Sequence, residues 1–116
     1  MVVALAGCAT DSVAPDEPRH VEAMPIAPYE IHEECATLAP GYRLDYRFEA
    51  TSPVDFSLYY KDGIAFVSPI SRAAVREFAG VFLSRDGRRY CLQWEAGQAG
   101  AIVNFRVRVM REGAAP

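Results

Sequence analysis

Residues 43–60, RLDYRFEATSPVDFSLYY, decide the fold class. Apolar and polar side chains alternate with a period of two, first from Arg43 to Ala50 and then from Val54 to Tyr60. Successive side chains of an extended strand point to opposite faces, so this alternation predicts two strands that each bury one face. Ser52-Pro53 lies between them and predicts a short corner.

Further strands are predicted on both sides of this stretch. Residues 103–109, VNFRVRV, alternate as regularly and predict a third strong strand. Weaker patterns predict strands at 30–37, 64–67, 81–85 and 89–95. Residues 71–78 fit a helical turn or a connection. Because Pro69 and Gly80 bound them closely, we interpret them as a connection.

Turn dipeptides separate the predicted strands. Pro40-Gly41 suits a type II turn, and Asp62-Gly63 and Asp86-Gly87 are favoured in tight hairpins. About seven short strands with this spacing are typical of a β-sandwich. We therefore expect an all-β chain: a single antiparallel β-sandwich of about seven to eight strands over residues 29–110, with a C-terminal tail at 111–116.

The start of the chain, MVVALAGC, ends in Leu5-Ala6-Gly7-Cys8, which resembles the lipobox of bacterial lipoproteins. The resemblance implies cleavage before Cys8 and attachment of lipid to its thiol, which anchors the protein to a membrane. Residues 1–7 are then a signal-peptide remnant. Their apolar run is short and carries no Lys or Arg, so we expect the true start upstream. The alternative is a cytosolic protein with a chance match.

Residues 8–28 are predicted to be a disordered tether that carries the lipid on Cys8. They contain four prolines among acidic and small residues, a composition that favours an extended spacer. Ala9 follows the cysteine. By analogy with Gram-negative sorting, this indicates the periplasmic face of the outer membrane.

Charge is spread unevenly along the chain. Residues 1–34 carry seven acidic side chains against Arg19 alone, whereas the remainder has a small basic excess. This asymmetry is typical of an acidic tether beside a folded domain, and the excess is too small for a nucleic-acid partner.

Two cysteines remain besides Cys8, namely Cys35 and Cys91. An even pair in an exported chain predicts one disulfide, whereas in a reducing compartment both would be free thiols. Cys91 is out of phase with Leu92 and Trp94, which we assign to the core. The disulfide is therefore expected on the outer face or at an edge, where it ties down the strand at 30–37.

A known family shares several of these features. The residues concerned run from Cys35 through Leu38, Gly41, LDYRF at 44–48 and PVDF at 53–56 to GVF at 80–82 and YCLQW at 90–94. Over residues 30–109 the chain resembles the Golgi-dynamics (GOLD) domain, the lumenal β-sandwich of eukaryotic cargo receptors, whose paired cysteines form a disulfide. The resemblance implies a β-sandwich that binds a protein or ligand outside the cytoplasm. Cargo sorting is not implied, because the receptors continue into a coiled coil and a membrane helix.

Catalytic and cofactor motifs are weak. His20 and His32 lack a partner at metal-ligand spacing, no serine lies in a nucleophile elbow, and no phosphate loop is present, so we expect no metal and no cofactor. Possible ligand contacts are Arg85, Arg88 and Arg89 around Asp86-Gly87, suited to a carboxylate or phosphate, together with Tyr59, which lies off the apolar face.

These observations favour a non-enzymatic lipoprotein of the cell envelope whose domain binds an envelope protein or an anionic polymer. One alternative is a small protease inhibitor or assembly chaperone that acts through an edge strand or a protruding hairpin. The other is a cryptic enzyme, which would require carboxylates or His32 to converge in a cleft.

Overall fold

The computed structural model describes residues 18–111. These residues form six antiparallel strands joined by turns and loops. They are β1 (Arg19–Ile26), β2 (Ile31–Leu38), β3 (Tyr42–Asp62), β4 (Ala65–Leu83), β5 (Arg88–Ala96) and β6 (Ala101–Arg111). The predicted all-β, antiparallel fold is confirmed. Within these residues no helix is long and apolar enough to cross a membrane.

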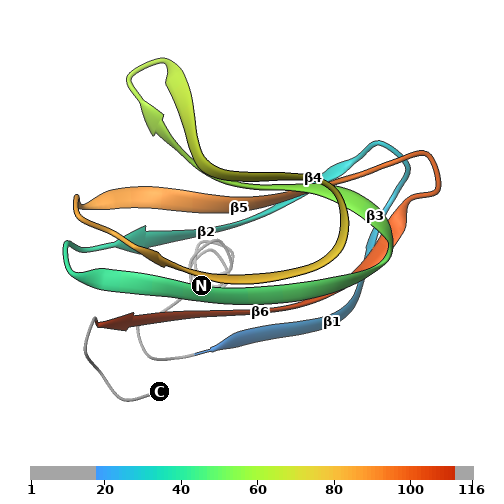
Figure 1. Cartoon of the computed structure of the whole chain (residues 1–116), viewed down its shortest axis with the longest axis horizontal. Helices are drawn as coiled ribbons and strands as arrows, with labels where there is room; N and C mark the ends of the chain where they lie inside the picture. The colour runs from blue at the N-terminus through green and yellow to red at the C-terminus, as the bar shows by residue number, and fades with distance from the viewer. Residues whose placement is uncertain (1–17, 112–116) are drawn as a thin grey trace, which may run out of the picture.

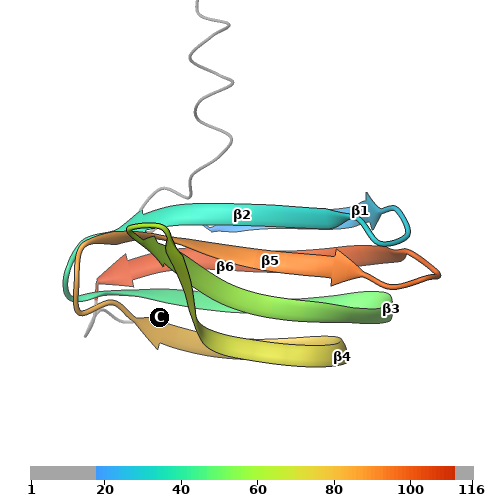
Figure 2. The ribbon, with the colours of Figure 1, turned by 90° about the horizontal axis from the view of Figure 1, so that it is seen from above.

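The strands form one sheet that curls on itself. Their hydrogen-bonded order is β1-β6-β3-β5-β2, and β4 runs beside β3. One half of β3 pairs with β6 and the other half with β5. The sheet therefore bends through β3, so that β6 and β1 face β5 and β2 across the core (Figures 1 and 2).

The bend lies at residues 51–53, where the corner was predicted. The last pair of β3 with β6 is Ala50 with Val103, and its first pair with β5 is Val54 with Ala96. At the bend the Thr51 hydroxyl accepts a hydrogen bond from the backbone N–H of Ile102 (3.0 Å). The chain turns here without leaving the sheet, so the two strands predicted over 43–60 are one.

Strand β4 overturns the prediction of a connection at 71–78. It pairs with β3 almost from end to end, and its other edge has no partner in the described chain. Proline is tolerated on such an edge strand, which accommodates Pro69. Gly80 lies opposite Tyr46, and a Cβ atom there would be 2.5 Å from the Tyr46 hydroxyl. Both residues that we took as strand breakers thus lie within a strand.

The predicted tether is wrong at its C-terminal end, because residues 19–26 form β1 and pair with β6. Three apolar side chains of this strand pack on the core, namely Val21, Met24 and Ile26. Their burial favours a strand despite the acidic residues and prolines of the predicted tether. The domain begins at Arg19 rather than Tyr29. Residues 8–17 and the tail at 112–116 lie outside the described residues. Six strands are observed instead of the predicted seven to eight. The strands predicted over 43–60 are one strand, β3, those predicted at 64–67 and 81–85 are both part of β4, and β1 is additional.

Two of the three predicted turns are confirmed. Gly41 has a φ of +86° between β2 and β3, and Gly63 has a φ of +68° between β3 and β4. Asp86-Gly87, however, is not a hairpin turn, because β4 and β5 do not pair with each other. It belongs to a loop that crosses from one layer to the other.

Aromatic rings from both layers fill the core. Trp94 on β5, predicted to be core, is 1% exposed, and its ring centroid lies 4.8 Å from that of Phe105 on β6. Phe48 and Phe56, from the two halves of β3, lie 5.7 and 5.8 Å from Trp94. The facing ends of the curled sheet are thus joined through one aromatic cluster.

Candidate functional site

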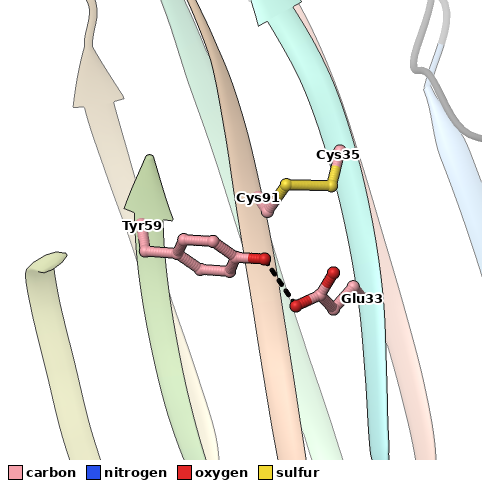
Figure 3. The surroundings of a disulfide bond; sticks show 4 residues. All are labelled: Glu33, Cys35, Tyr59 and Cys91. Carbon is pink, nitrogen blue, oxygen red and sulfur yellow. Dashed lines mark hydrogen bonds between the residues drawn. A yellow bond between two sulfur atoms is a disulfide. The ribbon is translucent and has the colours of Figure 1, made fainter. Parts of the chain in front are cut away.

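The outer face of β2, β5 and β3 carries the predicted disulfide. Cys35 and Cys91 lie directly opposite each other in the β2–β5 pairing, and their sulfurs are bonded (Figure 3). Both are nearly buried, but on the face opposite to Leu92 and Trp94. The expectation of a disulfide that secures an edge strand rather than crossing the core is confirmed.

Tyr59 lies beside the disulfide and is half-buried rather than fully exposed. Its hydroxyl donates a hydrogen bond to the Glu33 carboxylate at 2.5 Å (Figure 3). Burial and this bond raise the pKa of Tyr59 to about 12. The phenol therefore keeps its proton at neutral pH, which suits it to hydrogen bonding and packing rather than to nucleophilic or base chemistry.

One set of potential metal ligands occurs in the described chain. The ligand atoms of Glu33, Cys35 and Cys91 all lie within 4.8 Å of one another. Zinc binds cysteine as the thiolate, and here both sulfurs are consumed by the disulfide. In the oxidised protein this cluster therefore offers no thiolate to a metal, and its cysteines crosslink β2 to β5.

The far end of the β3–β4 hairpin projects beyond the rest of the sheet (Figure 1). We call residues 61–66 the hairpin tip. At its turn Ile64 is 98% exposed, and Phe66 is 66% exposed. Phe66 is held in place by the ring of Tyr59, 5.6 Å away, and by Lys61, whose Nζ lies 5.7 Å from the ring. The tip thus presents two large apolar side chains at the end of a paired hairpin.

The predicted arginine site is assembled only in part. The Arg88 guanidinium lies 4.5 Å from the Tyr60 ring, and its Nε is 3.5 Å from Asp86. A groove of about 350 Å³ beside the hairpin tip is lined by Tyr59, Tyr60, Lys61, Gly87, Arg88, Arg89 and Cys91. Arg85, on the crossing loop, is exposed and does not line this groove.

A buried carboxylate lies between the two ends of the curled sheet. Glu34 on β2 accepts hydrogen bonds from Arg19 on β1 at 2.7 and 3.2 Å and bonds to His32 at 2.9 Å. Burial by itself raises the pKa of Glu34, but the bonds from His32 and Arg19 outweigh it and hold the pKa below its ordinary value. This is a saturated ion pair that joins β1 to β2, rather than a carboxylate free to move protons.

Sequence reasoning missed Ile64 and Phe66. The available signal was the run of apolar residues IAFV at 64–67 directly after the Asp62-Gly63 turn, which we read only as a strand. In the structure that strand has no third neighbour to cover it.

Comparison with known proteins places the fold but no family. No family model and no curated protein matches this chain. Among solved structures it is similar to PliG of Aeromonas hydrophila, a periplasmic inhibitor of g-type lysozyme, with a TM-score of 0.59 and 11% identity over 84% of this chain and 95% of that one. It is also similar to the pre-peptidase C-terminal domain of a Bacillus anthracis collagenase, with a TM-score of 0.57 and 10% identity over 85% of this chain and 92% of that one. At such identity the likeness concerns the fold alone.

Proposed function

We propose that this chain is a non-enzymatic binding module of the bacterial cell envelope that engages another protein through the hairpin tip. The observation that carries the proposal is the exposure of Ile64 and Phe66 on a projecting hairpin whose two strands pair up to the turn. Exposed aromatic and large apolar side chains on a rigid support are typical of the centres of protein interfaces. The neighbouring groove with Arg88 and Arg89 supplies a polar rim.

The envelope location rests on the lipobox-like Leu5-Ala6-Gly7-Cys8 and on the disulfide, which suits an oxidising compartment. We propose lipid on Cys8 and, in a Gram-negative cell, the periplasmic face of the outer membrane. The position of the cysteines and the two facing layers also support a β-sandwich of the Golgi-dynamics type. The intact mass of the protein from its own membranes tests the anchor: acyl groups on a chain starting at Cys8 are expected, and an unmodified Cys8 would refute it.

The binding surface is tested by placing a photo-crosslinking amino acid at position 64 of the full-length protein in its own cells. We expect one discrete crosslinked partner, lost when Phe66→Ser is added. A probe at exposed Ala99, on the loop between β5 and β6, is the control. Equal yields at positions 64 and 99, or no crosslink at 64, would refute the proposal.

A second candidate, an inhibitor of an envelope enzyme, is favoured by the same hairpin, because a projecting finger can enter a cleft. The fold shared with a periplasmic lysozyme inhibitor supplies a target to try. In a cell-wall clearing assay with g-type lysozyme, inhibition that is abolished by Ile64→Ser would support this reading. Full lysozyme activity at saturating protein would exclude that target.

A further inference from the structure

A second surface, on the outer face of β1, β6 and β3, is distinct from the hairpin tip. Arg47 on β3 and Arg106 on β6 are directly opposite each other in the pairing, and His20 on β1 is opposite Arg106. Arg108 is on the same face of β6, two residues further on. We call these four residues the basic face.

Acidic groups compensate the basic face only in part. His20 is paired with Glu22 at 3.5 Å, and Glu49 lies beside Arg47 and Arg106 on the same face. Within residues 18–111, neither Arg47 nor Arg106 forms an ion pair. Asp45 lies directly opposite Arg108 in the pairing of β3 with β6. Its carboxylate, however, accepts a hydrogen bond from the Nε of Arg43 at 2.9 Å. Like charges placed directly opposite on adjacent strands destabilise a sheet. The pairing of Arg47 with Arg106 therefore has a cost that an anion would relieve.

A groove lies over these arginines. It has a volume of about 690 Å³ and is lined by Pro18, His20, Asp45, Tyr46, Arg47, Ala79, Gly80, Val81, Arg106 and Arg108. The Nε of Arg108 is buried and lacks a hydrogen-bond partner in the described chain. An acceptor bound in the groove would satisfy this donor. Ala79, Gly80 and Val81 of β4 line the side of the groove beyond β3.

We propose that the basic face binds the phosphate groups of anionic lipid headgroups. Guanidinium groups bind phosphate oxygens with paired hydrogen bonds, and three of them surround this groove. The source is argued from the chain itself. Pro18 lines the groove and is ten residues from Cys8, so an extended segment of about 35 Å at most separates the groove from the anchor. This step rests on the proposed membrane anchoring.

The test is co-sedimentation of the full chain carrying Cys8→Ser, which removes the lipid but keeps the domain. Vesicles of phosphatidylcholine alone are compared with vesicles that also contain phosphatidylglycerol. We expect binding only to the anionic vesicles, and a partition coefficient roughly thirtyfold lower in Arg47→Gln/Arg106→Gln, about fivefold for each charge removed. Arg85→Gln/Arg89→Gln, with the same change in net charge elsewhere, should bind as well as the parent.

Each other outcome overturns the proposal. Equal losses in both double variants would mean that only net charge matters, and equal binding to both vesicles would mean that no headgroup is recognised. Pyrophosphate that shifts the amide signals of Arg47 and Arg106 without vesicle binding would assign the site to free phosphate. Ile64→Ser serves as the separating control: it should leave vesicle binding intact, so that failure of this site is distinguished from failure of the hairpin tip. Thermal unfolding should show Arg47→Gln/Arg106→Gln at least as stable as the parent, since it removes a repulsion.

Discussion

The base and the tip of the β3–β4 hairpin share the same two strands but differ in what surrounds them. At the base, Phe48 and Phe56 are flanked by β6 and β5 and are nearly inaccessible to water. At the tip, Lys61 pairs only with Phe66 and Asp62 only with Ala65. A ribbon of two strands buries side chains only where further strands cover it.

This difference separates two tasks within one pair of strands. Core packing at the base determines the stability of the domain. At the tip, the exposed apolar side chains contribute little to folding. Substitutions at the base and at the tip should therefore have opposite consequences for folding and for binding.

The largest expected effect comes from Trp94, the centre of the base. Trp94→Ala should lower the free energy of unfolding by about 3–5 kcal/mol, because it leaves a cavity among Phe48, Phe56 and Phe105. Urea unfolding followed by circular dichroism measures this loss.

The matched control is Trp94→Phe. The indole N–H has no hydrogen-bond partner within residues 18–111, so a smaller ring forfeits packing only and should cost less than about 2 kcal/mol. A cost for Trp94→Phe equal to that for Trp94→Ala would contradict this expectation, because retained ring packing would then contribute nothing.

Next in size is the disulfide. Cys35→Ala/Cys91→Ala should lower stability by about 2–4 kcal/mol, because a loop with a sequence separation of 56 is no longer closed in the unfolded chain. The effect should be absent when variant and parent are compared under strong reduction. A persistent difference there would mean that packing of the cysteines, and not the crosslink, is responsible.

The sequence predicts the base better than the tip for the same reason. The alternation in 43–60 and 103–109 reflects one buried and one exposed face, and both stretches are strands with the expected core sides. Trp94 and the outward disulfide follow from the same phase rule.

The errors occur where burial does not follow local pattern. Much of β4 is exposed on both faces, so its sequence need not alternate between apolar and polar residues. The strand at residues 71–78 could therefore not be recognised from the pattern. In β1, the local pattern of apolar residues is too irregular to predict a strand, and the strand forms because it pairs with the edge of β6. The basic face could not be predicted for another reason. Arg47 and Arg106 are 59 positions apart in the sequence and become neighbours only through strand pairing.

A smaller effect is expected at Glu34, which joins the two ends of the sheet. Because its pKa is lowered in the folded state, its contribution is present above the ordinary carboxyl pKa and is lost as the pH falls through the lowered value. Glu34→Gln should cost about 1–3 kcal/mol at neutral pH, discounted because Arg19 remains partly in water.

Stability measured between neutral and acidic pH checks this prediction. The parent should lose stability on acidification more steeply than Glu34→Gln, and the two curves should converge at low pH. Glu33→Gln, with a carboxylate on the exposed face of the same strand, is the control and should keep the steep acid limb. Parallel curves for parent and Glu34→Gln would place the acid-sensitive group elsewhere.

The smallest effect on folding is expected at the tip, and it gives the sharpest contrast with the base. Ile64→Ser should change stability by no more than about 0.5 kcal/mol, because a side chain that is 98% exposed has almost no contacts to lose. Partner binding measured on the same sample should weaken by about tenfold or more, the usual loss when a central apolar contact of an interface is removed. If Ile64→Ser instead lowered stability as much as Glu34→Gln, the tip would be part of the fold's support and the division between base and tip would be wrong. Because an exposed isoleucine contributes nothing to the folded state on its own, a neutral effect on stability combined with lost binding would identify interaction as its role.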